Sequence, residues 1–216
     1  MSTAKPVAPE MLLPPCTLSF PNLFVPKLAP GGKAPKFSMT GIWTPGDVPK
    51  FDAVKQECAK LLLAKYGAPW LEAVKAGQLF WPFKPIAGLL VKPGYPEGGV
   101  LINFNANEDS PPHLFDRYRD VNTGKARVIT DPKVFYAGCQ VIVLARPYLF
   151  DVTTKKGVTL GLQAVQFWTD GPRLDGQTNP IEKFAAEDAP AAEMPMAQTE
   201  ESLSALLGGT GGVSLP

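Results

Sequence analysis

The clearest pattern along the chain runs from Val134 to Trp168, where two stretches rich in β-branched and aromatic residues flank a short polar loop. Gly157 lies in that loop, and the arrangement predicts a β-hairpin. Apolar and polar positions alternate in the first stretch, so one face is expected to pack on a core while the other stays partly accessible. The core face would carry Phe135, Ala137, Cys139, Val141 and Val143; the other would carry Tyr136, Gln140, Arg146 and Tyr148, mixed with Ile142 and Leu144.

The chain before this hairpin shows short strands and one strong helix. Alternation predicts strands over 16–20, 36–43 and 100–106. Apolar residues at helical spacing predict a helix from Lys50 to Tyr66, ended by Gly67, with a shorter helix following it over 69–76. The remaining segments are expected to be loops or irregular structure, namely 21–35, 79–99 and 110–133.

Composition divides the chain into three parts. Residues 1–14 are rich in Pro and Ala and are expected to be flexible, and residues 15–184 form the folded body. Residues 185–216 contain mainly Ala, Glu, Met, Pro, Ser and Gly, a composition that cannot bury enough apolar surface to fold, so a disordered acidic C-terminal tail is predicted.

The order of these elements favours a mainly β fold. Strand, strand, helix pair, strand, long loop and hairpin together predict an OB-like closed Greek-key β-barrel with a helical insertion between strands. Closure of the barrel would remove the unpaired edges that five short strands otherwise expose.

Charge is distributed unevenly over the 216 residues. The formal net charge is +1, but the tail has five carboxylates and no Lys or Arg, so it carries −5 and the rest of the chain carries +6. A basic body favours polyanions, and a tethered acidic tail can compete with them or recruit a basic partner. A tail that serves only solubility is the alternative.

Catalytic and metal-binding patterns are absent from the sequence. His113 is the only histidine, the three cysteines are far apart, and no C-x-x-C, G-x-S-x-G, Walker A or G-x-G-x-x-G motif occurs. We therefore expect no catalytic residue, no metal and no cofactor. A metal-dependent nuclease would have to use Glu108, Asp109, Asp116 and Asp120, of which the last two are interleaved with arginines. No apolar run is long enough to span a membrane, so no membrane partner is expected.

Binding of a flexible polyanion agrees better with the residues present. Proteins that hold single strands combine a basic groove with rings on which bases stack. Each ring taken singly could instead be core, and each cation could be a solvated surface charge. The candidate nucleic-acid-binding residues are Lys33, Lys36, Trp43, Arg117, Tyr118, Arg119, Lys125, Arg127, Tyr136, Arg146 and Tyr148.

Three runs in and after the predicted hairpin are distinctive, namely F-Y-A-G-C-Q-V (135–141), K-G-V-T-L-G-L-Q-A-V-Q-F (156–167) and D-G-P-R-L-D-G (170–176). Together they resemble a family of phage single-stranded-DNA-binding proteins. Four further runs also match the order of elements in that family: S-F-P-N-L-F (19–24), K-F-S-M-T (36–40), P-P-H-L-F-D-R (111–117) and E-K-F (182–184). The similarity therefore covers roughly residues 15–184.

The resemblance implies an OB fold and non-catalytic coating of single-stranded DNA during phage replication or recombination. It also implies an acidic C-terminus that modulates binding and recruits phage or host replication proteins, in the cytoplasm of the infected bacterial host. Self-association is left open. A non-catalytic structural or partner-docking role, motivated by the aromatic, Pro-rich segment 79–99, is the alternative.

Overall fold

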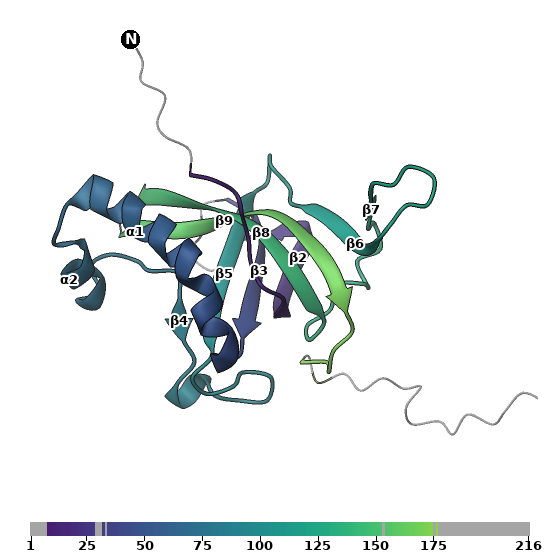
Figure 1. Ribbon diagram of the computed structural model, residues 1–216, viewed down its shortest axis with the longest axis horizontal. Coiled ribbons are helices and arrows are strands. Elements are labelled where there is room, and N and C mark those ends of the chain that lie inside the picture. The colour runs from purple at the N-terminus through teal and green to yellow at the C-terminus, as the bar shows by residue number, and fades with distance from the viewer. Residues whose placement is uncertain (1–7, 29–31, 33, 153, 175, 177–216) are drawn as a thin grey trace, which may run out of the picture. The chain divides into compact units, whose positions relative to one another are not determined.

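The computed structural model describes residues 8–28, 32, 34–152, 154–174 and 176, and these are mainly β-strands (Figure 1). Nine strands of this part of the chain form one sheet, and the long helix α1 lies against β8 and β9. The strands are β1 (Met11–Leu12), β2 (Cys16–Lys27), β3 (Lys36–Trp43), β4 (Lys84–Pro85), β5 (Val100–Asn107), β6 (His113–Arg119), β7 (Ala126–Val128), β8 (Gln140–Val152) and β9 (Lys155–Thr169). The helical segments are η1 (Pro45–Phe51), α1 (Asp52–Tyr66), α2 (Trp70–Lys75) and η2 (Gly88–Leu90).

Five of the strands pair in a ring. β8 pairs with β2, β2 with β3, and β3 with β5, all antiparallel. β5 pairs in parallel with β9 at Phe104 and Leu160, and β9 pairs back to β8 along most of its length. The second half of β9 pairs instead with β6, which forms a hairpin with β7. β9 therefore has β5 beside its first half and β6 beside its second.

The inward faces of these strands form the hydrophobic core. Val141 and Val143 on β8, Leu160 on β9 and Phe104 on β5 are at most 1% exposed. Burial of an apolar side chain of this size stabilises the fold by ~1.5–3 kcal/mol. The alternation predicted for the first arm of the hairpin is confirmed over β8, since the positions between its buried residues are half-buried or exposed.

The predicted hairpin is present as β8 and β9, but its first arm starts at Gln140 rather than at Val134. Gly138 has a φ of 116°, and a Cβ there would lie 2.0 Å from the carbonyl oxygen of Pro172. Only glycine fits this close approach, so residues 134–139 form a turn against the chain that follows β9.

The predicted helix over 50–66 is confirmed, with its α-helical part beginning at Asp52 because Pro45–Phe51 forms a 3₁₀ turn. Val54, Cys58 and Leu62 are its buried residues, as the spacing predicts. The helix ends at Gly67, which has a φ of 73°.

Two predicted loops contain strands. Residues 21–35 were expected to be a loop, but β2 continues to Lys27, with register shifts on either side of Asn22 that accommodate its two prolines. Residues 110–133 were also expected to be a loop, but they contain β6 and β7. Simple alternation fails in β6 because Asp116 takes a buried position.

Regular structure begins before residue 15. Met11 and Leu12 pair with β8, and Leu13 is buried, so the expectation of a flexible segment over 1–14 is wrong for these three residues. The predicted acidic tail, 185–216, lies outside the described residues, as does the end of the predicted body at 181–184. Among the helices described, none has the length and apolar character needed to cross a membrane.

Candidate nucleic-acid interface

The strand registers place four of the eleven predicted residues, Lys36, Arg117, Arg146 and Tyr148, on one surface. Residues paired across neighbouring strands point to the same side of a sheet, so the register fixes which side chains share a face. We call the side chains that point away from the core the outer sheet face. It comprises Lys36, Ser38 and Thr40 on β3; Asn103, Asn105 and Asn107 on β5; Arg146 and Tyr148 on β8; Gly161, Gln166 and Trp168 on β9; and His113, Phe115 and Arg117 on β6.

Gly161 lies at the centre of this face. It is paired with Arg146 on one side and with Asn105 on the other. A Cβ at position 161 would lie 3.2 Å from the Tyr148 ring, so the glycine lets that ring lie against the sheet. Burial against the sheet raises the pKa of Tyr148, yet the residue stays 40% exposed. The ring is therefore held in place and remains accessible above a hollow of about 610 Å³.

Arg146 borders the same hollow and already has an anionic partner. One of its terminal nitrogens donates to Glu10 Oε1 over 2.6 Å, and both side chains are partly exposed. Its Nε is buried and has no hydrogen-bond partner among the described residues. Glu10 is placed there because the adjacent Met11 and Leu12 pair with β8. An incoming phosphate would compete with Glu10 for this guanidinium.

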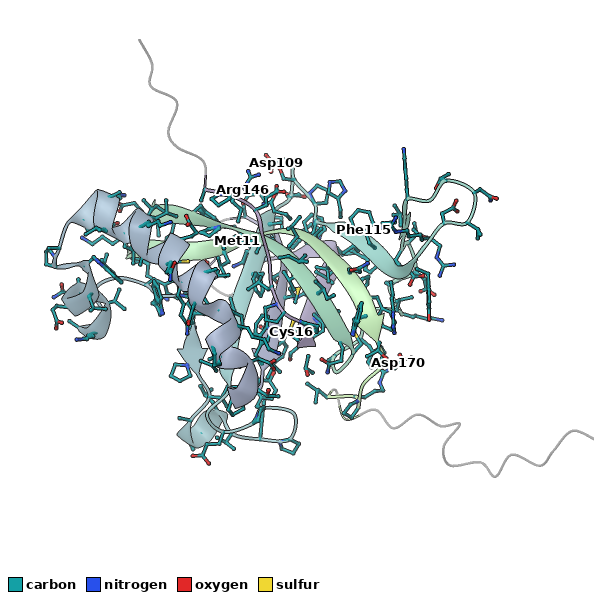
Figure 2. All side chains as sticks on the ribbon, viewed as in Figure 1. Met11, Cys16, Asp109, Phe115, Arg146 and Asp170 are labelled. Carbon is teal, nitrogen blue, oxygen red and sulfur yellow. The ribbon has the colours of Figure 1, made fainter. Side chains whose placement is uncertain are left out.

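A second group lies along β6 and the end of β9. The Arg117 guanidinium is 4.5 Å from the centre of the Trp168 ring, and the rings of His113 and Phe115 stack with centres 6.1 Å apart. A cation over an aromatic face is attracted to the ring and is also ready to contact a phosphate. Figure 2 shows Phe115 towards the β7 side of the molecule and Arg146 nearer α1.

The β6–β7 hairpin carries four further predicted residues, one ring and three cations. The Tyr118 ring is 66% exposed, and Arg119 and Lys125 are exposed near the turn. Arg127 instead forms an ion pair with Asp116, whose side chain is 11% exposed. Partial burial alone would raise the pKa of Asp116, but hydrogen bonds from Arg127 and from the Tyr118 amide outweigh it and hold that pKa below its usual value.

Two lysines lie where β2 and β3 pair, at the β3 side of the outer sheet face. Lys36 begins β3 and lies directly opposite Lys27 on β2, and both are exposed. Like charges opposite each other across strands repel, and a polyanion over them would relieve the repulsion. Lys33, which was predicted to belong to the site, lies outside the described residues.

Two predicted rings lie neither on the outer sheet face nor on the β6–β7 hairpin. Trp43 was predicted to contact nucleic acid, but it is 1% exposed, packs edge-on against Phe51 and donates its indole N–H to the Pro14 carbonyl, so it is a core residue. Tyr136 lies in the turn before β8, where its hydroxyl bonds to Asp170 and to Gly171. It lines a different groove from that of Arg146 and Tyr148.

Sequence reasoning missed the paired rings on β6. His113 and Phe115 were treated as loop residues, although the H-L-F-D-R run does alternate if Asp116 is accepted at a buried position. Asp116 is held by Arg127, and Asp120 accepts the amide hydrogens of Asn122 and Thr123, so two of the four carboxylates considered for a nuclease have structural partners. The described residues contain no group of three or more His, Cys, Asp or Glu that could hold a metal ion.

Comparisons with known proteins agree on one group. The family model described as "Enterobacter phage Enc34, ssDNA-binding protein" matches residues 10–194. The solved structure of the single-stranded DNA-binding protein from bacteriophage Enc34 in complex with ssDNA is 19% identical, with a TM-score of 0.56 over 76% of this chain and 89% of that one. A C-terminal truncation of the same protein is 17% identical, with a TM-score of 0.57 over 80% of this chain and 100% of that one.

A further structural neighbour comes from another phage. It is gp2.5, a single-stranded DNA-binding protein encoded by bacteriophage T7, at 14% identity and a TM-score of 0.50 over 86% of this chain and 99% of that one. At these identities the structural likeness shows the fold. A search of curated protein sequences gives no significant match.

The Asp116–Arg127 pair generates a stability prediction. Because its folded-state pKa is lowered, Asp116 stabilises the fold above its unfolded-state pKa and loses that contribution as pH falls through the folded value. Asp116→Asn should lower the free energy of unfolding by about 1–2 kcal/mol at pH 7, and the difference should shrink as the solution becomes more acidic than that folded pKa. Urea unfolding across this range measures it. The exposed Asp109→Asn is the matched control, and a loss that is independent of pH would contradict the assignment.

Proposed function

This chain belongs to the family of the Enterobacter phage Enc34 single-stranded-DNA-binding protein, and from that premise we propose that its outer sheet face binds single-stranded DNA without catalysing a reaction. The observation that carries the proposal is the arrangement around Gly161, where the Tyr148 ring and the Arg146 guanidinium border one open hollow. Rings supply stacking to any base and cations supply attraction to phosphate, so the binding is expected to tolerate any sequence.

The fold that supports this function is an OB-like closed Greek-key barrel. The ring of pairings β8–β2–β3–β5–β9 supports it, because a sheet whose last strand pairs with its first has no free edge. In OB folds the second and third strands present the binding face. Here those strands would be β3 and β5, whose outward residues are Lys36, Ser38, Thr40, Asn103, Asn105 and Asn107.

The biological setting is proposed from the same family. The protein would coat and protect single strands during phage replication or recombination, in the cytoplasm of the infected bacterial cell. The acidic segment 185–216 would modulate binding and contact phage or host replication proteins through its charge.

Partner docking through the segment between α2 and β5 is a second candidate role. Leu89, Leu90 and Val91 are exposed on this segment, and contiguous apolar side chains of this kind are typical of interfaces. Co-purification of a phage protein after nuclease treatment of the extract, lost when Leu89 and Leu90 are both replaced by Ser, would favour this role.

The proposed function predicts binding that depends strongly on salt. For a handful of phosphate contacts, the logarithm of affinity should fall with the logarithm of salt concentration at a slope of ~−2 to −4. Fluorescence titrations with single-stranded, duplex and RNA oligomers measure this directly. Tyr148→Ala should weaken binding by ~1–3 kcal/mol, the usual contribution of one stacked base. A flat salt dependence, or no binding to oligo-dT, would contradict the proposal.

Glu10 should restrain binding through Arg146. A partly exposed pair of this kind contributes ~0.2–1 kcal/mol, so Glu10→Gln should raise affinity for oligo-dT by about 1.5- to 5-fold at low salt. A double-mutant cycle with Arg146→Gln measures the coupling. Glu57→Gln is the matched control, because Glu57 pairs with Lys60 on α1. If Glu10→Gln has the same effect in the presence and absence of Arg146, the competition is absent.

The acidic tail should compete with DNA for the basic body. Truncation after Phe184 removes all five carboxylates of segment 185–216, so binding of single strands should tighten and duplex binding should become measurable. Titration at low salt, where screening is weakest, is the appropriate measurement. Equal affinities of the truncated and full-length chains under those conditions would rule the competition out.

A further inference from the structure

A groove separate from the outer sheet hollow contains both rings and cations. It has a volume of about 900 Å³. Its walls are the irregular part of β2, the loop before β5, the turn before β8 and the residues that follow β9. This volume is in the range of small-molecule sites. The residues on which the argument rests are Phe20, Lys92, Tyr95, Lys133, Tyr136 and Arg173.

Phe20 is the unusual residue of this groove. It has a φ of 48°, and it is the one non-glycine residue in the described part of the chain with a positive φ. A bulky side chain is disfavoured in this conformation, and such outliers are concentrated at functional sites. The ring is also 64% exposed, so no burial compensates for the strain. The register of β2 against β3 shifts between Ser19 and Asn22, so Phe20 lies within an irregularity of the strand.

Two of the groove's cations lie over aromatic rings. Lys92 Nζ lies 4.4 Å from the centre of the Tyr95 ring, and the Arg173 guanidinium lies 4.8 Å from that of Tyr136. Tyr95 is in turn fixed by a 2.6 Å hydrogen bond between its hydroxyl and that of Ser19, and Tyr136 by its bond to Asp170.

The described wall of the groove carries cations and no carboxylate. No Asp or Glu is among its described lining residues, and Asp170, which lies beside the groove, accepts the hydrogen bond of the Tyr136 hydroxyl. Neither Lys92 nor Lys133 forms an ion pair with a carboxylate of the described residues. These two lysines favour an anion, and the exposed Phe20 ring favours a flat apolar group beside it. A phosphate joined to a base has both properties.

We propose that this groove binds an unpaired nucleotide of a single strand, with its base stacked on Phe20 and its phosphate beside Lys92 and Lys133. The site rests on the proposed function and extends it, because the groove is distinct from the hollow formed by Arg146 and Tyr148. In Figure 2, Asp170, which anchors Tyr136, lies well apart from Arg146. A single strand of DNA that contacted both sites would run over the protein surface past the end of β9.

Phe20→Gly tests the stacking contact. Glycine adopts a positive φ without strain, so the melting temperature should stay the same or rise, while affinity for oligo-dT should fall by about 5- to 150-fold. An oligomer of abasic sites has no base to stack, so its affinity should be the same for both proteins. Val25→Ala removes an exposed apolar side chain from the same strand outside the groove and should bind as the wild type does.

Lys133→Gln tests the phosphate contact. Loss of one neutralised phosphate should make the salt slope shallower by ~0.7, whereas Lys60→Gln on α1 should leave it unchanged. Wild-type protein that does not bind oligo-dT would contradict the proposed function itself. If the wild type binds oligo-dT, but Phe20→Gly has the same affinity and Lys133→Gln the same salt slope, the proposed nucleotide site in the groove is overturned. The proposed function of the outer sheet face would then still stand. Phe20→Trp, which keeps a stacking ring, should retain binding.

Discussion

The arrangement of the whole surface depends on how β9 divides its free edge between two partners. One edge of β9 is occupied by β8 along most of its length. Its other edge pairs with β5 at Leu160 and Gly161, and then with β6 from Ala164 to Gln166. A strand has only two hydrogen-bonding edges. Because β9 changes partner along one of them, β5 and β6 both lie beside that edge in the same sheet. The outward residues of β3, β5, β6, β8 and β9 therefore form one surface.

Three arginines on or beside this surface already have internal partners. Arg146 is held by Glu10 and Arg127 by Asp116, while the Arg117 guanidinium lies over the Trp168 ring. Such contacts fix the side chains before a ligand arrives, which lowers the entropy that binding would cost. These contacts differ in how readily the partner can be exchanged. Asp116 is buried and bonded to the backbone, whereas Glu10 is exposed and lies just before the two-residue edge strand β1. Arg146 is therefore the arginine whose partner a phosphate could most easily replace.

The sequence predicted the regular elements better than the site, and particular residues explain why. Trp43 has the same parity along β3 as Phe37 and Met39, so the alternation that located the strand also indicated that this ring is buried. In β6 the opposite occurred, because a buried carboxylate interrupted the apolar pattern and its partner Arg127 lies on another strand. The roles of Gly161 and Phe20 depend on register and on one backbone torsion, and neither can be derived from residue order.

The segment between α2 and β5 covers part of the sheet and also forms one wall of a groove. Ile42 points outward from β3, yet it is 3% exposed, because Ile86 and Tyr95 of this segment pack over it. The segment thus covers the part of the β2–β3–β5 face nearest the end of β3, and a ligand is confined to the part that begins at Lys36. Tyr95 then reaches Ser19 on the neighbouring strand β2 and forms one wall of the Phe20 groove. The segment therefore covers a flat part of the sheet and forms a concave surface beside it. A base bound in the proposed site would be enclosed there on more than one side.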